Sequence, residues 1–114
     1  MPMKRHLTLT QLEGDDWGSP PYDSFLVKEC HRLRHVPLRD LTVEHLRMLV
    51  GQGISLAYTV PLALEHLAID PMVSGDMYPG DLLKAVERVP ADFWAQHPSL
   101  LAEWQKVKSG AARR

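Results

Sequence analysis

Two histidines and a cysteine close together in the sequence are the first candidates for chemistry. His31 and His35 are four residues apart, so on a helix they would share one face, a spacing that can bind a metal ion. No third ligand accompanies them, because Cys30 would point about 100° away from His31 and no glutamate lies between the histidines. Cys30 instead follows the apolar stripe of Leu26 and Leu33, which predicts a small core residue. We expect neither a metal site nor a nucleophile here.

The acidic residues also lack the partners that catalysis or calcium binding requires. Glu65 and His66 are adjacent, so on a helix they would point about 100° apart and form part of a polar surface. Asp76 and Asp81 flank a glycine-containing turn, but the other ligand positions of a calcium loop are absent. The sequence also has no glycine-rich phosphate loop, nucleophile elbow or CxxC pair. It therefore predicts a protein that is not an enzyme and needs no cofactor or metal.

The charge is small overall but unevenly distributed. The net charge is −1, yet residues 13–27 contain four acids and no lysine or arginine. Residues 61–83 also contain four acids and no lysine or arginine. These acids are Glu13, Asp15, Asp16, Asp23, Glu65, Asp70, Asp76 and Asp81. If the two segments share a face, that face would attract a basic partner and repel nucleic acid.

A basic cluster leaves nucleic-acid binding open as an alternative. Its members are Arg32, Arg34, Arg39 and Arg47. No aromatic residues interleave with them to stack on bases, and the acidic segments oppose the approach of phosphates. We therefore rank this alternative below binding to a protein.

Length, cysteine content and hydropathy predict one cytoplasmic domain. The chain has 114 residues, enough for a single core, which we place in residues 1–108, with a flexible basic tail at 109–114. Cys30 is the only cysteine, which favours a reducing compartment. No apolar run follows the basic start of the chain, so no signal peptide is expected. The most apolar stretch, 54–64, is about half the roughly 20 residues that a membrane span needs.

The hydrophobic periodicity is helical almost throughout. Asp23 or Ser24 can cap a helix that stops before Pro37, and Thr42 can cap a second helix that ends at the GQG of 51–53. Residues 7–12 (LTLTQL) could form a short strand or a helical turn.

The second half of the chain continues the helical pattern. Residues 54–69 are apolar on nearly every side, which is typical of a buried helix. Pro61 must kink this helix or begin a new one capped by Thr59. Asp81 would cap the next helix, and Pro98 suits the first turn of the last. We predict an all-α domain of five to seven helices joined by short Pro/Gly-rich loops.

Three long motifs resemble a known family. They are LEGDDWG (12–18), RHVPLRDLTVEHLRMLVGQGISLAYTVPLALEHL (34–67) and DPMVSGDMYPGDLL (70–83). In this order they are similar to immunity proteins of bacterial contact-dependent growth inhibition systems, and the resemblance covers residues 7–94. Two positions depart from the family pattern: His45 stands where an acid is usual, and Met77 where an aromatic or larger apolar residue is frequent.

The resemblance implies a cytoplasmic inhibitor that binds the toxin domain of a large surface protein, often a nuclease. A nuclease holds phosphates with basic groups, so the carboxylates of an inhibitor can occupy the same groups. The candidate toxin-binding residues are Glu13, Asp15, Asp16, Asp76, Tyr78 and Asp81. Trp17 recurs in the family motif and is expected in the core. A helical adaptor for an unrelated protein partner remains the alternative from a different class.

Overall fold

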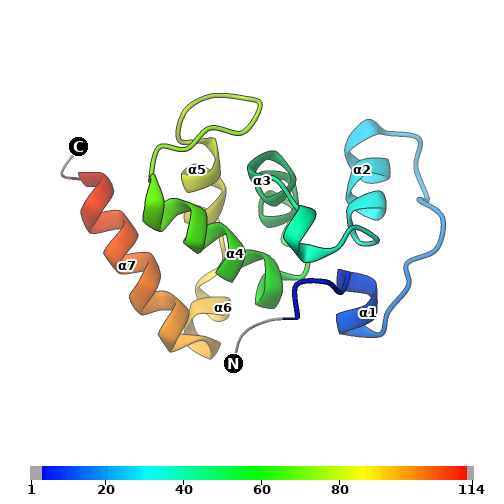
Figure 1. Ribbon diagram of the computed structural model, residues 1–114, viewed down its shortest axis with the longest axis horizontal. Helices are drawn as coiled ribbons and strands as arrows, with labels where there is room; N and C mark the ends of the chain where they lie inside the picture. The colour runs from blue at the N-terminus through cyan, green and yellow to red at the C-terminus, as the bar shows by residue number, and fades with distance from the viewer. Residues whose placement is uncertain (1–3, 113–114) are drawn as a thin grey trace. The chain divides into compact units, whose positions relative to one another are not determined.

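The computed structural model describes residues 4–112, and this part of the chain is helical with no β-strand. Figure 1 shows the helices in chain order, from α1 near the N-terminus to α7 near the C-terminus. Their bounds are α1 Leu9–Glu13, α2 Phe25–Leu33, α3 Val43–Gly51, α4 Leu56–Ile69, α5 Asp81–Glu87, α6 Ala91–Gln96 and α7 Pro98–Ala112, with a 3-10 helix, η1, at Leu38–Asp40. The predicted all-α class is therefore confirmed.

The chain divides into two compact units, one up to Leu41 and one from Thr42 onward. The first unit contains α1, α2 and η1. In the second unit α3 packs against α4 and α5, α4 also packs against α7, and α6 packs against α7 (Figure 1). The assignment of residues 1–108 to one domain stays a prediction.

The first unit begins with a short helix and not a strand. Thr8 caps α1, and its side chain and that of Gln11 exchange hydrogen bonds with each other's backbone N–H groups. Ser24 caps α2, as one of the two predicted caps, by accepting a hydrogen bond from the N–H of Val27. On α2, Cys30 is 3% exposed and Leu33 is fully buried, so the predicted core position of the cysteine is confirmed.

Thr42 caps α3 as predicted. Its hydroxyl accepts from the N–H of His45, and Nδ1 of His45 accepts from the N–H of Thr42. His45 thus takes the place that glutamate or glutamine holds in the usual capping box.

Helix α4 passes through Pro61 without starting again, so the predicted cap at Thr59 is wrong. Ser55, at φ 53°, is the N-cap, and the Thr59 hydroxyl donates back to the carbonyls of Ile54 and Ser55 inside the first turn. The proline removes one backbone hydrogen bond. The helix persists because Val60 and Ala63 are fully buried, as expected for its nearly all-apolar surface.

The last two helices form an aromatic corner. Trp94 of α6 stacks on Trp104 of α7 with ring centroids 6.1 Å apart, and Phe93 stacks on His97 at 4.2 Å. Pro98 begins α7 as predicted, whereas α6, which follows Pro90, was not predicted. Residues 109–112 of the predicted flexible tail continue α7, and its last two residues, 113–114, lie outside the described part of the chain.

Candidate functional site

The 13–18 loop, which follows α1, is organised by one buried arginine. Arg34, at the end of α2, is 1% exposed, and its Nη1 pairs with the carboxylate of Glu13. Its Nη2 donates to the backbone carbonyl of Asp15 at 2.6 Å, and its guanidinium carbon lies 4.3 Å from the ring centroid of Trp17. The backbone carbonyl of Arg34 in turn accepts from the N–H of Thr10 at 3.0 Å. The planar guanidinium of Arg34 therefore holds the loop from the inside, because its donors match the positions of the acceptors.

Two predicted site residues remain on the outside of this loop. Asp15 is exposed, and so is Asp16, whose Oδ1 accepts from the N–H of Gly18 at 2.9 Å and lies 3.7 Å from Nε2 of His35. Trp17 is 40% exposed and meets His31 edge to face with ring centroids 5.2 Å apart. The prediction that Trp17 is a core residue is wrong, because its ring lies between the buried guanidinium and solvent.

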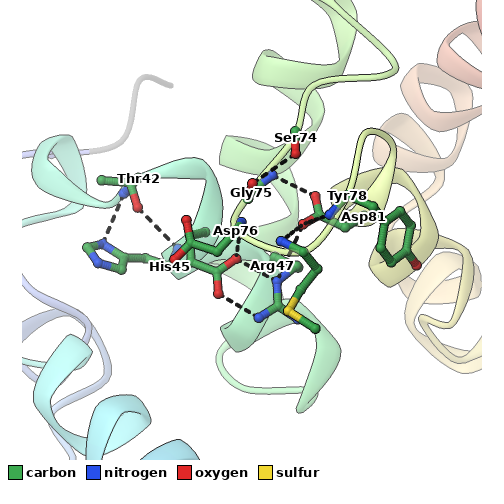
Figure 2. Close-up of polar contacts among 10 residues, drawn as sticks. Thr42, His45, Arg47, Ser74, Gly75, Asp76, Tyr78 and Asp81 are labelled. Atoms are coloured by element: carbon green, nitrogen blue, oxygen red, sulfur yellow. Dashed lines mark hydrogen bonds and ion pairs between the residues drawn. The ribbon is translucent and has the colours of Figure 1, made fainter.

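The 74–80 loop, between α4 and α5, is fixed by a buried carboxylate. Asp81 is 3% exposed, and its Oδ1 accepts from the N–H of Gly75 at 2.7 Å (Figure 2). Its Oδ2 accepts from the N–H groups of Met77 at 3.1 Å and Tyr78 at 3.5 Å. The predicted cap at Asp81 is therefore corrected. Gly80, at φ 89°, occupies the N-cap of α5, and Asp81 is the first residue of the helix.

A second carboxylate reaches the same loop from α3. Glu44 forms a two-pronged ion pair with Arg47, whose Nε and Nη2 each donate at 2.6 Å (Figure 2). Oε1 of Glu44 also accepts from the N–H of Asp76 at 2.9 Å, and Nε of Arg47 lies 3.7 Å from Oδ2 of Asp81. We call Glu44, Arg47 and Asp81 the frame of the loop. One arginine thus compensates two carboxylates that together accept four loop N–H groups.

Gly75 lies close to α3, with no room for a side chain. A Cβ atom there would lie 2.6 Å from Oε1 of Glu44 and 3.2 Å from the Cα atom of Glu44. Since Arg47 holds the carboxylate in place, a larger residue at this position would have to displace it. Of the predicted site residues in this segment, Asp76 is exposed and Tyr78 is 50% exposed.

The pairing of Glu44 makes stability depend on pH. Hydrogen bonds from Arg47 are the main cause that lowers the pKa of Glu44 below its ordinary value of 4.5, and the N–H of Asp76 adds to the effect. Because the folded-state pKa lies below the unfolded-state pKa, the contribution is complete above about pH 4.5 and is lost as the pH falls through the folded-state value. Urea unfolding of wild type should therefore lose more free energy between neutral and acid pH than unfolding of Glu44→Gln. Equal losses would contradict the assignment.

The structure also corrects the predicted basic cluster. Arg34 is buried, Arg47 is paired within the frame, and Arg32 pairs with Glu29 on α2, whereas Arg39 is exposed. Three of the four cations are thus already engaged with acids. Within residues 4–112, no group of three or more histidines, cysteines or acids is placed to bind a metal ion.

The residues that hold both loops were not recognised as such in the sequence. Glu44 and Arg47 are three residues apart on a helix, and this spacing was a readable signal for an ion pair. Arg34 gave no such local signal, because its partner Glu13 is 21 residues away.

The family is identified by comparison. A model of the CDI immunity proteins matches residues 11–104, which include both loops and the residues that hold them. The chain therefore belongs to the CDI immunity protein family, and the resemblance found in the sequence motifs is confirmed. Membership of this family implies neutralisation of a cognate toxin. The chain has no significant match among the curated proteins or the solved structures.

No helix in residues 4–112 is long and apolar enough to cross a membrane.

Proposed function

We propose that this protein acts in the cytoplasm as an inhibitor of a nuclease toxin domain delivered by contact-dependent growth inhibition. It binds the C-terminal toxin domain of a large exoprotein and covers the active site or the path of the substrate, without catalysing a reaction. The match of residues 11–104 to the immunity family carries this proposal. The exposed acids on the two loops support the nuclease as target, because basic groups that hold phosphates also bind carboxylates.

The candidate contacts divide into two kinds by the role of their side chains. Asp15, Asp16, Asp76 and Tyr78 are exposed, so we assign them to the toxin contact. Glu13 is exposed as well, but its carboxylate pairs with the buried Arg34. Asp81 is buried, and its carboxylate accepts hydrogen bonds from loop N–H groups. We assign these two residues to holding the contact residues in place.

Co-expression with the toxin domain encoded directly upstream tests the function. We expect rescue of growth and a complex that survives gel filtration. Toxicity that persists at equal expression, with no complex in the column, would contradict the proposal. A helical adaptor for an unrelated partner would give that result.

The acidic loop residues should control the rate of association. Replacing Asp15 and Asp16 with lysine should slow binding to a basic toxin about tenfold at low ionic strength, because the encounter loses charge steering. Stopped-flow or surface-based kinetics at two salt concentrations measures this, and the difference should shrink as salt screens the charges.

A matched control separates contact from net charge. Glu87 and Asp92 are exposed and lie on α5 and α6, so Glu87→Lys with Asp92→Lys changes the net charge by the same amount elsewhere on the protein. We expect a smaller effect from this pair. An equal slowing by both pairs would assign the effect to net charge and remove the 13–18 loop from the interface.

A further inference from the structure

The exposed apolar side chains of the second unit are confined to one short segment. In residues 42–112, every exposed large hydrophobic side chain lies between positions 69 and 78. The exposed fractions are 82% for Ile69, 42% for Met72, 64% for Met77 and 50% for Tyr78. An exposed segment rich in large apolar side chains is a candidate for a surface that another molecule covers.

Two of these side chains stand on a backbone that the frame fixes. The N–H groups of four consecutive residues, 75–78, donate to the carboxylates of Glu44 and Asp81 (Figure 2). The two ends of the loop are also joined. The N–H of Gly80 donates to the carbonyl of Met72 at 3.1 Å, and Ser74 and Pro79 form an isolated antiparallel bridge. The polar backbone thus faces inward while Met77 and Tyr78 remain in solvent.

A turn between two helices does not need this arrangement. A buried carboxylate carries a desolvation cost, which is offset here by Arg47 and by the loop N–H groups. What the frame adds is a single loop conformation in the absence of a partner. A contact loop that is already ordered loses less conformational entropy when it binds.

We propose that Met77 and Tyr78 form the apolar centre of the toxin contact, and that Glu44, Arg47 and Asp81 are positioning residues that order the 74–80 loop before the toxin arrives. This inference rests on the proposed function. The matching surface on the toxin is an apolar pocket with basic groups beside it, because the exposed Asp76 precedes Met77 and the nearby Arg47 is already paired with Glu44.

The first test removes the apolar centre. Met77→Ala with Tyr78→Ala should raise the Kd for the purified toxin domain roughly 30-fold or more, mainly through faster dissociation. The thermal midpoint should stay unchanged, since both side chains are exposed. Tyr22→Ala with Phe25→Ala is the matched control, because these side chains are 71% and 76% exposed in the other unit. An unchanged Kd for the first pair, or an equal loss for the control, overturns the assignment.

The second test addresses the frame in the free protein. Hydrogen exchange of the amides of residues 75–77 should be slow in wild type, despite their place in a surface loop, because they donate to Asp81 and Glu44. It should be fast in Glu44→Gln, since this variant loses the charge that pairs with Arg47 and so loosens the whole frame. The same variant should raise the Kd about tenfold, because the binding-competent loop is then populated only in part. Gly75→Ala should act in the same direction. Gly110→Ala, where a Cβ atom meets nothing within 4 Å, should change neither quantity.

The outcomes distinguish the two proposals. Suppose that wild type binds the toxin domain, and that Glu44→Gln shows fast exchange but the same Kd as wild type. The positioning role is then wrong, while the proposed function stands. Fast exchange at residues 75 and 77 in wild type also overturns the positioning role. If wild type does not bind the toxin domain at all, the proposed function falls and this inference with it.

Discussion

Arg34→Ala is expected to lower the free energy of unfolding by about 2–4 kcal/mol, which is a large part of the stability of a small domain. The guanidinium is 1% exposed, so its removal leaves the Glu13 carboxylate without this partner. The carbonyl of Asp15 loses its donor as well, and the Trp17 ring loses the cation beneath it. Urea unfolding followed by circular dichroism measures the loss.

Arg32→Ala is the matched control for that experiment. Arg32 lies on the same helix but is exposed and pairs with Glu29 on the surface, so its removal should cost about 0–1 kcal/mol. Arg34→Lys should behave more like the alanine variant, because a lysine cannot donate in two directions from a planar fork. Similar losses for Arg32→Ala and Arg34→Ala would show that Arg34 does not organise the loop.

Asp81→Ala is expected to destabilise the second unit by about 2–4 kcal/mol. The change leaves the N–H groups of Gly75, Met77 and Tyr78 without their acceptor in a partly buried position. It also removes one of the two carboxylates beside Arg47. The loss should appear as a lower thermal midpoint in calorimetry and as faster hydrogen exchange in residues 75–78.

Asp76→Ala provides the comparison for Asp81→Ala. Asp76 is exposed and its part in the frame is made by its backbone N–H, which alanine keeps. Its removal should leave stability within about 0.5 kcal/mol of wild type, as for most surface substitutions. A thermal midpoint for Asp76→Ala as low as that of Asp81→Ala would contradict the assignment of the supporting role to Asp81.

Local signals in the sequence were sufficient to predict most of the fold. Ser24 and Thr42 precede apolar residues at helical spacing, and both are caps because each hydroxyl needs only a backbone N–H three residues away. The apolar segment that became α4 was predicted for the same reason. The helix α6 was missed, since its six residues are too few to show a clear period.

The details of the candidate site depended on partners distant in the sequence. Arg34 appeared to be a surface cation because its neighbours on α2 and η1 are basic, whereas its acceptors lie 19 and 21 residues away. Trp17 was expected in the core because it recurs in the family motif, yet its ring is 40% exposed and covers the buried guanidinium of Arg34. Glu44 reaches the N–H of Asp76 over 32 residues, a contact that no local pattern encodes.

The 74–80 loop was predictable in part. Its turn residues were evident, and Gly80 does adopt a left-handed conformation. The role of Asp81 was not evident, because an aspartate before an apolar run predicts a helix cap. In the structure its carboxylate instead accepts hydrogen bonds from the preceding loop. Both roles place an acid at the start of a helix, so sequence alone cannot separate them.

The burial of Cys30 has a practical consequence for studying this protein. The thiol is 3% exposed, and burial, with a smaller contribution from Glu29, raises its pKa, so little reactive thiolate forms near neutral pH. It is also the only cysteine in the chain. A single cysteine introduced on an exposed face can therefore carry a fluorescent or spin label without first removing the native one. Labels on either loop would report separately on the arrival of a toxin.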